Sequence, residues 1–150
     1  LKAVYFRKFT LFTEWPDENN THYNNTFKIT VLGKNPFGNI LENIYATETI
    51  DNKKVEIDYR NTISENIETD ILFISKSKQK DIEKIIDILT GKPILTIGDT
   101  EGYAQKGVLI NFYLENRKVR FEINESAVKK AGFIMDFRLL SFARIVHPVK

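Results

Sequence analysis

The first part of the chain has a helical pattern of apolar side chains, and a polar segment follows it. Four of them recur at helical spacing, at Val4, Tyr5, Phe9 and Phe12. No glycine or proline interrupts this pattern before Pro16, so we predict a helix over residues 2–14. Residues 17–26 are polar and rich in asparagine, which indicates an exposed loop.

The middle of the chain alternates short apolar strands with helical segments. Strands are predicted at 27–32, 55–59, 71–75 and 93–97. A helix is predicted over about 37–46, with Asn35 as its cap. A second helix carries Ile82, Ile85, Ile86 and Leu89 on one stripe and is closed by Gly91. This β-α-β-β-α-β order predicts a Rossmann-like, mostly parallel sheet.

The C-terminal third has a different pattern. Residues 108–114 and 118–123 flank a short polar turn, which predicts an antiparallel hairpin that extends the sheet. Asn124 is expected to cap a short helix ending at Gly132. Asp136 is expected to cap a last helix whose shared face is formed by Leu139, Phe142, Ala143 and Val146. The predicted fold class is α/β, a Rossmann-like helix-sheet-helix sandwich, formed as a single domain over residues 1–150.

Composition narrows the chemistry. The 150 residues include no cysteine, which excludes a thiol nucleophile, a disulfide framework and thiolate zinc sites. The 22 basic and 20 acidic residues give a net charge of +2, so nucleic acid is not indicated as a partner. Charge is nevertheless uneven, because residues 40–75 carry a net charge of −5 and residues 117–150 carry +5. These segments are either docking faces for a partner or solvated faces.

Local motifs offer little for catalysis. The Gly33–Gly38 turn precedes a helix but lacks the lysine of a phosphate-binding loop, so we interpret it as a tight turn. Ser75 and Ser77 follow a strand without the motif of a hydrolase nucleophile, and we interpret Ser77 as a helix cap. His22 and His147 are interpreted as surface residues. We therefore predict no catalytic residue, no metal site and no cofactor.

Several polar residues still stand at positions where function is common. Asp70, Asp99 and Glu101 lie at strand ends, where α/β folds bind ligands and where carboxylates also cap turns. Arg120 and Glu122 share one strand face, and they are expected to pair with each other or with the last helix.

One aromatic residue is a candidate anchor. Trp15 stands directly before Pro16 at a predicted helix end, where an indole can bind a partner. We expect Trp15→Ala to weaken partner binding more than it lowers stability. A strongly destabilised variant would assign Trp15 to the core instead.

Six segments taken together resemble a known family. They are, in order, Glu14-Trp15-Pro16; Leu32-Gly33 with Pro36-Phe37-Gly38; Asp70-Ile71-Leu72-Phe73-Ile74-Ser75; Leu95-Thr96-Ile97-Gly98-Asp99 with Gly102-Tyr103-Ala104; Val119-Arg120-Phe121-Glu122-Ile123-Asn124; and Leu139-Leu140 with Ala143-Arg144. Their order and register over nearly the whole chain resemble the YfiR family of bacterial periplasmic regulators.

This resemblance implies a sheet sandwiched by helices, export to the periplasm and no enzymatic activity. It implies that the chain binds the periplasmic domain of a membrane diguanylate cyclase and represses that enzyme, which controls cyclic di-GMP signalling. The candidate binding residues at matched positions are Trp15, Asp99, Arg120, Glu122 and Arg144. Some family members respond to redox through cysteines, a switch that cannot operate in a chain without cysteine.

Other interpretations stay open. The chain begins at Leu1, and we expect that an upstream signal peptide has been removed. Alternatively, the chain is the extracytoplasmic ligand-sensing domain of a membrane histidine kinase. A third interpretation is an enzyme that assembles Asp99, Glu122 and His22 into a site. Whether the chain also forms a homodimer is left open.

Overall fold

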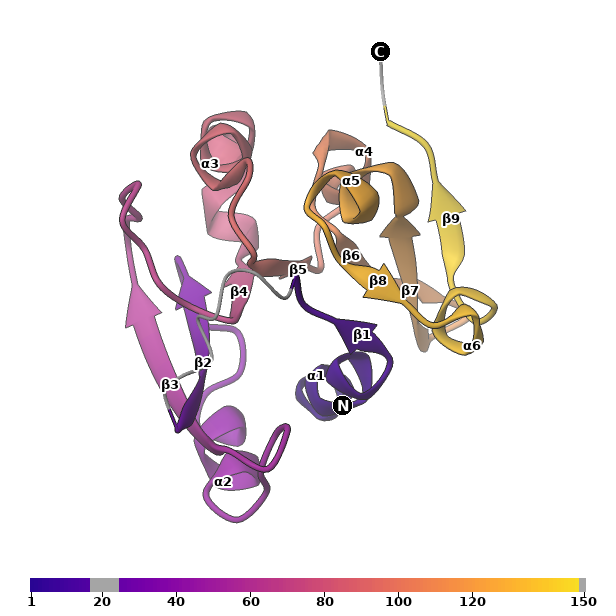
Figure 1. Cartoon of the computed structure of the whole chain (residues 1–150). Coiled ribbons are helices and arrows are strands. Elements are labelled where there is room, and N and C mark those ends of the chain that lie inside the picture. The colour runs from indigo at the N-terminus through magenta and orange to yellow at the C-terminus, as the bar shows by residue number, and fades with distance from the viewer. Residues whose placement is uncertain (17–24, 149–150) are drawn as a thin grey trace.

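The computed structural model describes residues 1–16 and 25–148, and its centre is a mixed sheet of seven strands. The strand bounds are β2 Thr26–Leu32, β3 Lys54–Arg60, β4 Ile71–Ile74, β5 Leu95–Gly98, β6 Ile110–Glu115, β7 Lys118–Asn124 and β9 Arg144–Val146. Across the sheet the order is β3-β2-β4-β5-β6-β7-β9, and Figure 1 shows β3 and β9 at opposite sides of the molecule. Neighbouring strands are parallel except for the β6-β7 hairpin. The predicted α/β fold, with a mostly parallel sheet extended by an antiparallel hairpin, is confirmed.

Helices cover both faces of this sheet. Their bounds are α1 Lys2–Leu11, α2 Ile40–Tyr45, the 3-10 helix η3 Lys76–Asp81, α3 Ile82–Leu89, α4 Tyr103–Lys106, α5 Glu125–Lys130 and α6 Phe137–Leu140. Strand β4 shows why there are two cores, because successive side chains of a strand point to opposite faces. Ile71 and Phe73 pack in the core that contains α1 and α2 residues. Leu72 and Ile74 pack in the core that contains α3 and α4 residues.

The first helix is shorter than its sequence pattern predicts. It ends at Leu11, and it buries Phe6 and Phe9 while Val4 is 56% exposed. The prediction of a helix to residue 14 was therefore wrong at its end. Strand β1 (Thr13–Glu14) instead pairs with β8 (Ile134–Met135), a contact that is distant in sequence and overrides the local helical pattern.

The last predicted helix is also corrected. Asp136 does cap a helix, since its Oδ1 accepts a hydrogen bond from the Arg138 N–H (2.8 Å), but α6 ends at Leu140. Strand β9 follows and pairs with β7. Phe142, predicted on the buried face of a longer helix, is 77% exposed. The outer edge of β7 offers unpaired backbone groups, and pairing with them replaces the last turns of the predicted helix.

Caps set the ends of two other helices. Asn124 caps α5 as predicted, because its Oδ1 accepts from the Ala127 N–H (3.0 Å). Asn35 does not cap α2, which has Asn39 at its N-cap position. Instead, Asn35 Oδ1 accepts from the Phe37 N–H (2.9 Å) and closes the preceding turn.

Candidate functional site

A buried carboxylate, Glu122 on β7, lies at the centre of a polar group on one face of the sheet. Glu122 is 2% exposed. Its Oε2 accepts a hydrogen bond from Asn111 Nδ2 (2.9 Å), and its Oε1 accepts from Arg144 Nε (3.1 Å). The strand register explains the contact, since Glu122 is opposite Asn111 on β6 and opposite Arg144 on β9. Three strands thus supply one polar side chain each, and the buried charge has a cationic partner.

Asn111 connects this group to the loop after β5. Its Oδ1 accepts from the Thr100 N–H (3.2 Å), and its Nδ2 also donates to the Thr100 carbonyl oxygen (2.9 Å). The preceding residue, Asp99, forms an ion pair with Lys2 of α1 (2.9 Å). Asp99 therefore lies in the loop that Asn111 holds, one residue before the Thr100 backbone that Asn111 binds. These contacts are structural cross-links within the chain.

Arg144 is the surface member of the group. Its side chain is 53% exposed, and the guanidinium lies over the ring of Tyr113, 3.9 Å from the ring centroid. The hydrogen bond from Arg144 to Glu122 raises the pKa of the guanidinium. Arg144 is thus a permanent cation, fastened on its buried side and open on its outer side to an anionic group.

Arg120 takes no part in this group. It shares the strand face of Glu122 but pairs with Glu115 (3.5 Å), and both side chains of that pair are about half exposed. Of the two alternatives predicted for Arg120 and Glu122, pairing with each other or with the last helix, the first does not occur. The partner of Glu122, Arg144, comes from β9 and not from a last helix.

Trp15 lies in an aromatic cluster. Its ring packs edge-on against Phe27 (5.7 Å between centroids) and Phe133 (5.3 Å). The side chain is half-buried and packs against the core beneath α1. This packing gives Trp15 a structural contact with β2 that its sequence context did not predict.

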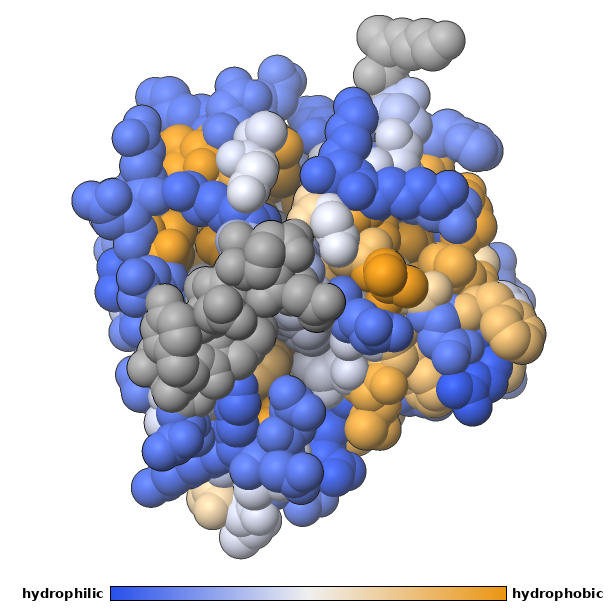
Figure 2. Space-filling model, in the orientation of Figure 1, coloured by the Kyte–Doolittle hydropathy of each residue, from blue (hydrophilic) through white to orange (hydrophobic). Residues whose placement is uncertain are grey.

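Large apolar side chains are exposed along the C-terminal segment. We define the C-terminal apolar surface by five exposed residues: Leu11, Ile134, Phe137, Phe142 and Ile145. Figure 2 shows apolar side chains gathered over β8 and toward α6. The β1-β8 pairing brings the end of α1 to this segment, and the Asp136 N–H donates to the Phe12 carbonyl oxygen (2.8 Å). Exposed patches of this kind mark interaction sites in soluble proteins.

The acidic and the basic segments of the sequence lie apart in the structure. The acidic segment 40–75 forms α2, β3 and β4, whereas the basic segment after residue 116 forms β7, α5, α6 and β9. Since β3 and β9 are opposite edges of the sheet, the two segments lie at opposite ends of the molecule. The C-terminal apolar surface therefore lies in the basic half.

The remaining predicted candidates have structural roles or lie at the surface. Gly33, with φ of +93°, packs so closely that an added Cβ would lie 2.5 Å from Ser77 Oγ. Ser77 Oγ accepts from the Lys34 N–H (2.9 Å), so this amide of the turn is not free for an anion. The cap of η3 is Ser75 and not Ser77 as predicted. Asp70 Oδ2 accepts from the Lys28 N–H (2.9 Å), which ties β2 to the start of β4.

Neither histidine forms a site in the described part of the chain. His147 is exposed, and His22 lies outside the described residues. Residues 1–16 and 25–148 contain no group of three or more histidine or carboxylate side chains placed to hold a metal ion. The enzyme site proposed from Asp99, Glu122 and His22 stays untested, because His22 lies outside the described residues.

Two features of the site were missed in the sequence. Asn111 is a polar residue between the buried apolar residues Ile110 and Phe112, and that interruption was a signal for a buried polar contact. The exposure of Phe137 and Phe142 had no signal, since both residues fit a helical pattern whose buried face only tertiary structure fixes.

Comparison with known proteins identifies the family. A family model described as YfiR/HmsC-like matches residues 1–144. The chain belongs to this family. The YfiR/HmsC-like family consists of periplasmic, non-catalytic regulators of cyclic di-GMP signalling, and its members generally bind a membrane signalling partner. A search of curated proteins found no match to this YfiR/HmsC-like chain.

Within residues 1–16 and 25–148 of this YfiR/HmsC-like chain, no helix has the length and apolar character needed to cross a bilayer.

Proposed function

We propose that this chain binds the periplasmic domain of a membrane diguanylate cyclase and holds that enzyme inactive. It acts by binding, without a reaction of its own, and its release raises cyclic di-GMP. The family supplies the class of partner. The single observation that supports a mode of binding is the exposure of the C-terminal apolar surface.

The exposed phenylalanines supply the free energy for this binding. Phe137 is 76% exposed and Phe142 is 77% exposed, so about three quarters of each residue's surface is in contact with water. Burying one such side chain is worth about 2 kcal/mol from the hydrophobic effect. Two aromatic anchors at the centre of an interface are sufficient to dominate its affinity.

Cations border the same surface and suggest the chemistry of the partner. Arg138 is 65% exposed and adjoins Phe137, and its guanidinium lies 5.1 Å from the centroid of the Phe12 ring. Arg144 is 53% exposed and precedes Ile145. Each of these guanidinium groups already pairs with a carboxylate of this chain, Arg138 with Asp136 and Arg144 with Glu122. We therefore infer a partner surface with an apolar centre and hydrogen-bond acceptors at its rim.

The buried polar group gives three of the predicted site residues a role in this proposal. Glu122 holds Arg144 and thereby fastens β9 to β7. Asp99 fastens the N-terminus of α1 to the loop after β5 through Lys2. These are positioning roles, since they fix the two ends of the chain between which the C-terminal apolar surface is formed.

Titration calorimetry tests the proposal. The chain is titrated against the periplasmic domain of the diguanylate cyclase that is encoded next to it. We expect one-to-one binding with a Kd of about 1 μM or tighter. Absence of binding at about 50 μM contradicts the proposal. Sedimentation of the chain alone, over the same concentrations, shows whether a second copy of the chain competes for the surface.

A further inference from the structure

The outward face of α1 is apolar, which is unusual for a surface helix. The helix buries Ala3, Phe6 and Phe9 in the core. On its other side, Val4 is 56% exposed and Leu11 is 67% exposed. A helix that is apolar on both faces normally packs against a partner on each of them. Since Val4 and Leu11 are exposed, the described part of the chain leaves the outer face of α1 without a cover.

Four residues follow this outer face with the spacing of a helix–helix seam. They are Leu1, Val4, Lys8 and Leu11, all exposed, and we call them the α1 outer stripe. With about 3.6 residues per turn, positions that are alternately three and four residues apart lie in one row along a helix. Single exposed leucines are common on protein surfaces, but a row with this spacing is the pattern by which one helix packs along another.

Lys8 lies within this stripe and has no carboxylate partner in the described structure. Its Nζ is 5.8 Å from the centroid of the Tyr5 ring, and this ammonium group forms no ion pair with a described residue. The sequence of α1 contains no acidic residue. The other two cations of α1 are already held, Lys2 by Asp99 and Arg7 by the Thr49 carbonyl oxygen. A cover for the stripe therefore has to neutralise Lys8.

The position of Lys8 decides between three kinds of cover. A helix that lies in a bilayer surface keeps its lysines on its polar face, whereas Lys8 lies between Val4 and Leu11 in the apolar stripe. A second copy of α1 would bring further basic residues and no acid to the stripe. A helix of another protein that carries apolar residues in one row and a carboxylate among them fits both the aliphatic side chains and Lys8.

On the basis of the proposed function, we further propose that an acidic amphipathic helix of the cyclase's periplasmic domain packs along the α1 outer stripe. Apolar side chains of that helix cover Val4 and Leu11, and one of its carboxylates pairs with Lys8. Leu11 also belongs to the C-terminal apolar surface, so the two areas join at the end of α1. The partner's contact segment thereby has a defined secondary structure and a defined charge.

Carbodiimide coupling of the native complex shows which group contacts Lys8. The chain is mixed with the periplasmic domain of the cyclase and treated with a water-soluble carbodiimide, which joins a lysine amine to an adjacent carboxylate as an amide with loss of water. Mass spectrometry of the digested product locates the new bond. We expect Lys8 to be joined to a partner glutamate or aspartate that has apolar residues about three and four positions away.

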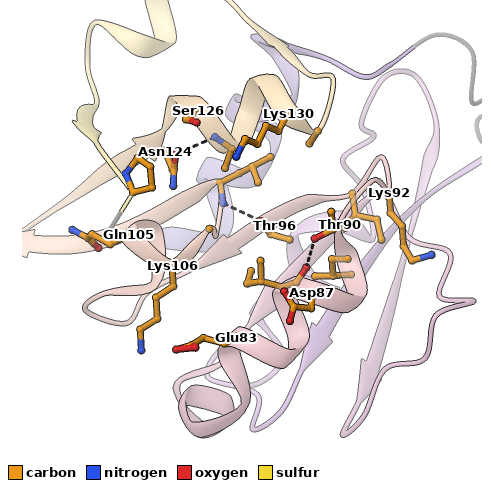
Figure 3. A pocket seen from close by; sticks show the side chains of 18 of the residues that line it. Glu83, Asp87, Thr90, Lys92, Thr96, Gln105, Lys106, Asn124, Ser126 and Lys130 are labelled. Carbon is orange, nitrogen blue, oxygen red and sulfur yellow. Dashed lines mark hydrogen bonds between the residues drawn. The ribbon is translucent and has the colours of Figure 1, made fainter. Parts of the chain in front are cut away.

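Charge reversal with a matched control measures the contribution of Lys8 by calorimetry. Lys8→Glu should weaken binding of the cyclase domain about tenfold, whereas Lys106→Glu should change it by less than about twofold. Both lysines are exposed and lie in the last turn of their helices. Lys106, however, lines the open cleft between α3, α4 and α5 (Figure 3), and α4 packs in the core on the other face of the sheet.

A second exchange tests the apolar part of the stripe. Val4→Gln should weaken binding about fivefold, because Val4 belongs to the stripe and not to the C-terminal apolar surface. Ile40→Gln is the control, since Ile40 is a similarly exposed aliphatic residue on α2. All the substituted side chains are exposed, so the variants should fold, and circular dichroism checks this.

Two results contradict the helix on α1 while partner binding is intact. They are equal affinity of the native and Lys8→Glu chains, and a coupled complex in which Lys8 is joined to no partner carboxylate. A native chain that does not bind the cyclase domain contradicts the proposed function as well, so the two failures are distinct.

Two further results would assign the stripe to another cover and overturn the proposal. One is flotation of the native chain with vesicles of phosphatidylethanolamine and phosphatidylglycerol that Val4→Gln abolishes, because it assigns the stripe to lipid. The other is self-association of the native chain in sedimentation that Val4→Gln abolishes, because it assigns the stripe to a second copy. We expect neither.

Discussion

Arg144 and Glu122 form an ion pair whose two partners differ in exposure, 53% for the arginine side chain and 3% for the carboxylate. The pair joins β9, the last strand, to β7. Because the carboxylate is buried, its charge depends on the arginine and on Asn111 for compensation. The pair is therefore what ties the C-terminal strand of the sheet to its neighbour by side chains.

Removing the cation should destabilise the fold. In Arg144→Ala the Glu122 carboxylate stays buried without a cationic partner, and we expect the free energy of unfolding to fall by about 2 kcal/mol, a value reduced for the exposure of Arg144. Urea denaturation measures this loss. The double variant Glu122→Gln/Arg144→Ala should recover part of it, since no buried charge is then left.

Arg120→Ala is the matched control for that substitution. Arg120 lies on the same sheet face, but its partner Glu115 is exposed and 3.5 Å away. A surface ion pair of this kind contributes about 0.5 kcal/mol or less. Equal destabilisation by Arg120→Ala and Arg144→Ala would show that the buried carboxylate carries no special cost.

Alkaline pH should weaken the packing of α2 against α1. Burial raises the pKa of the Tyr45 hydroxyl to about 12, and this hydroxyl donates a hydrogen bond to the Ala3 carbonyl oxygen (3.0 Å). Because this pKa lies above the unfolded value near 10, the stabilisation is complete below about pH 10 and is lost as pH rises toward 12. We expect a loss of about 2 kcal/mol over this interval.

Urea denaturation at several alkaline pH values measures this effect. Tyr45→Phe should lower stability at neutral pH by about 1 kcal/mol and flatten its alkaline dependence. Tyr59→Phe is the control, because Tyr59 also has a pKa raised to about 12 but is 40% exposed and bonds to Glu42 at the surface. An alkaline dependence that Tyr45→Phe leaves unchanged would refute the assignment.

Trp15 is the residue for which the structure changes the expectation. Its edge-on contacts with Phe27 and Phe133 connect the segment after α1 to β2 and to the segment before β8. We now expect Trp15→Ala to lower the free energy of unfolding by about 3 kcal/mol. Trp15→Phe should cost less than half as much. Weakened partner binding at unchanged stability would restore the role of Trp15 as an exposed anchor.

The sequence could predict those elements whose patterns are local. The strand at Ile71–Ile74 is apolar on both faces and lies between two helical layers as expected. The caps by Asn124 and Asp136 were also predictable, because a cap depends on residues two or three positions away.

Elements that depend on distant pairing could not be predicted in this way. Thr13 was predicted to be helical but pairs with Met135 in a strand. Arg144 was also predicted to be helical but lies in a strand opposite Glu122. In both places backbone hydrogen bonds to a remote strand outweigh a weak helical propensity. The same limit hid the exposure of Phe142, and with it the C-terminal apolar surface.

We propose that the C-terminal apolar surface represses a membrane diguanylate cyclase. The most direct measurement is the rate of cyclic di-GMP synthesis by the full-length cyclase in proteoliposomes, with the chain added on the periplasmic side. We predict that the native chain lowers this rate at least tenfold, as does the control Ile40→Ala, whose exposed apolar residue lies on α2. The folded variant Phe137→Ala/Phe142→Ala should leave the rate unrepressed, and equal repression by that variant would contradict the account.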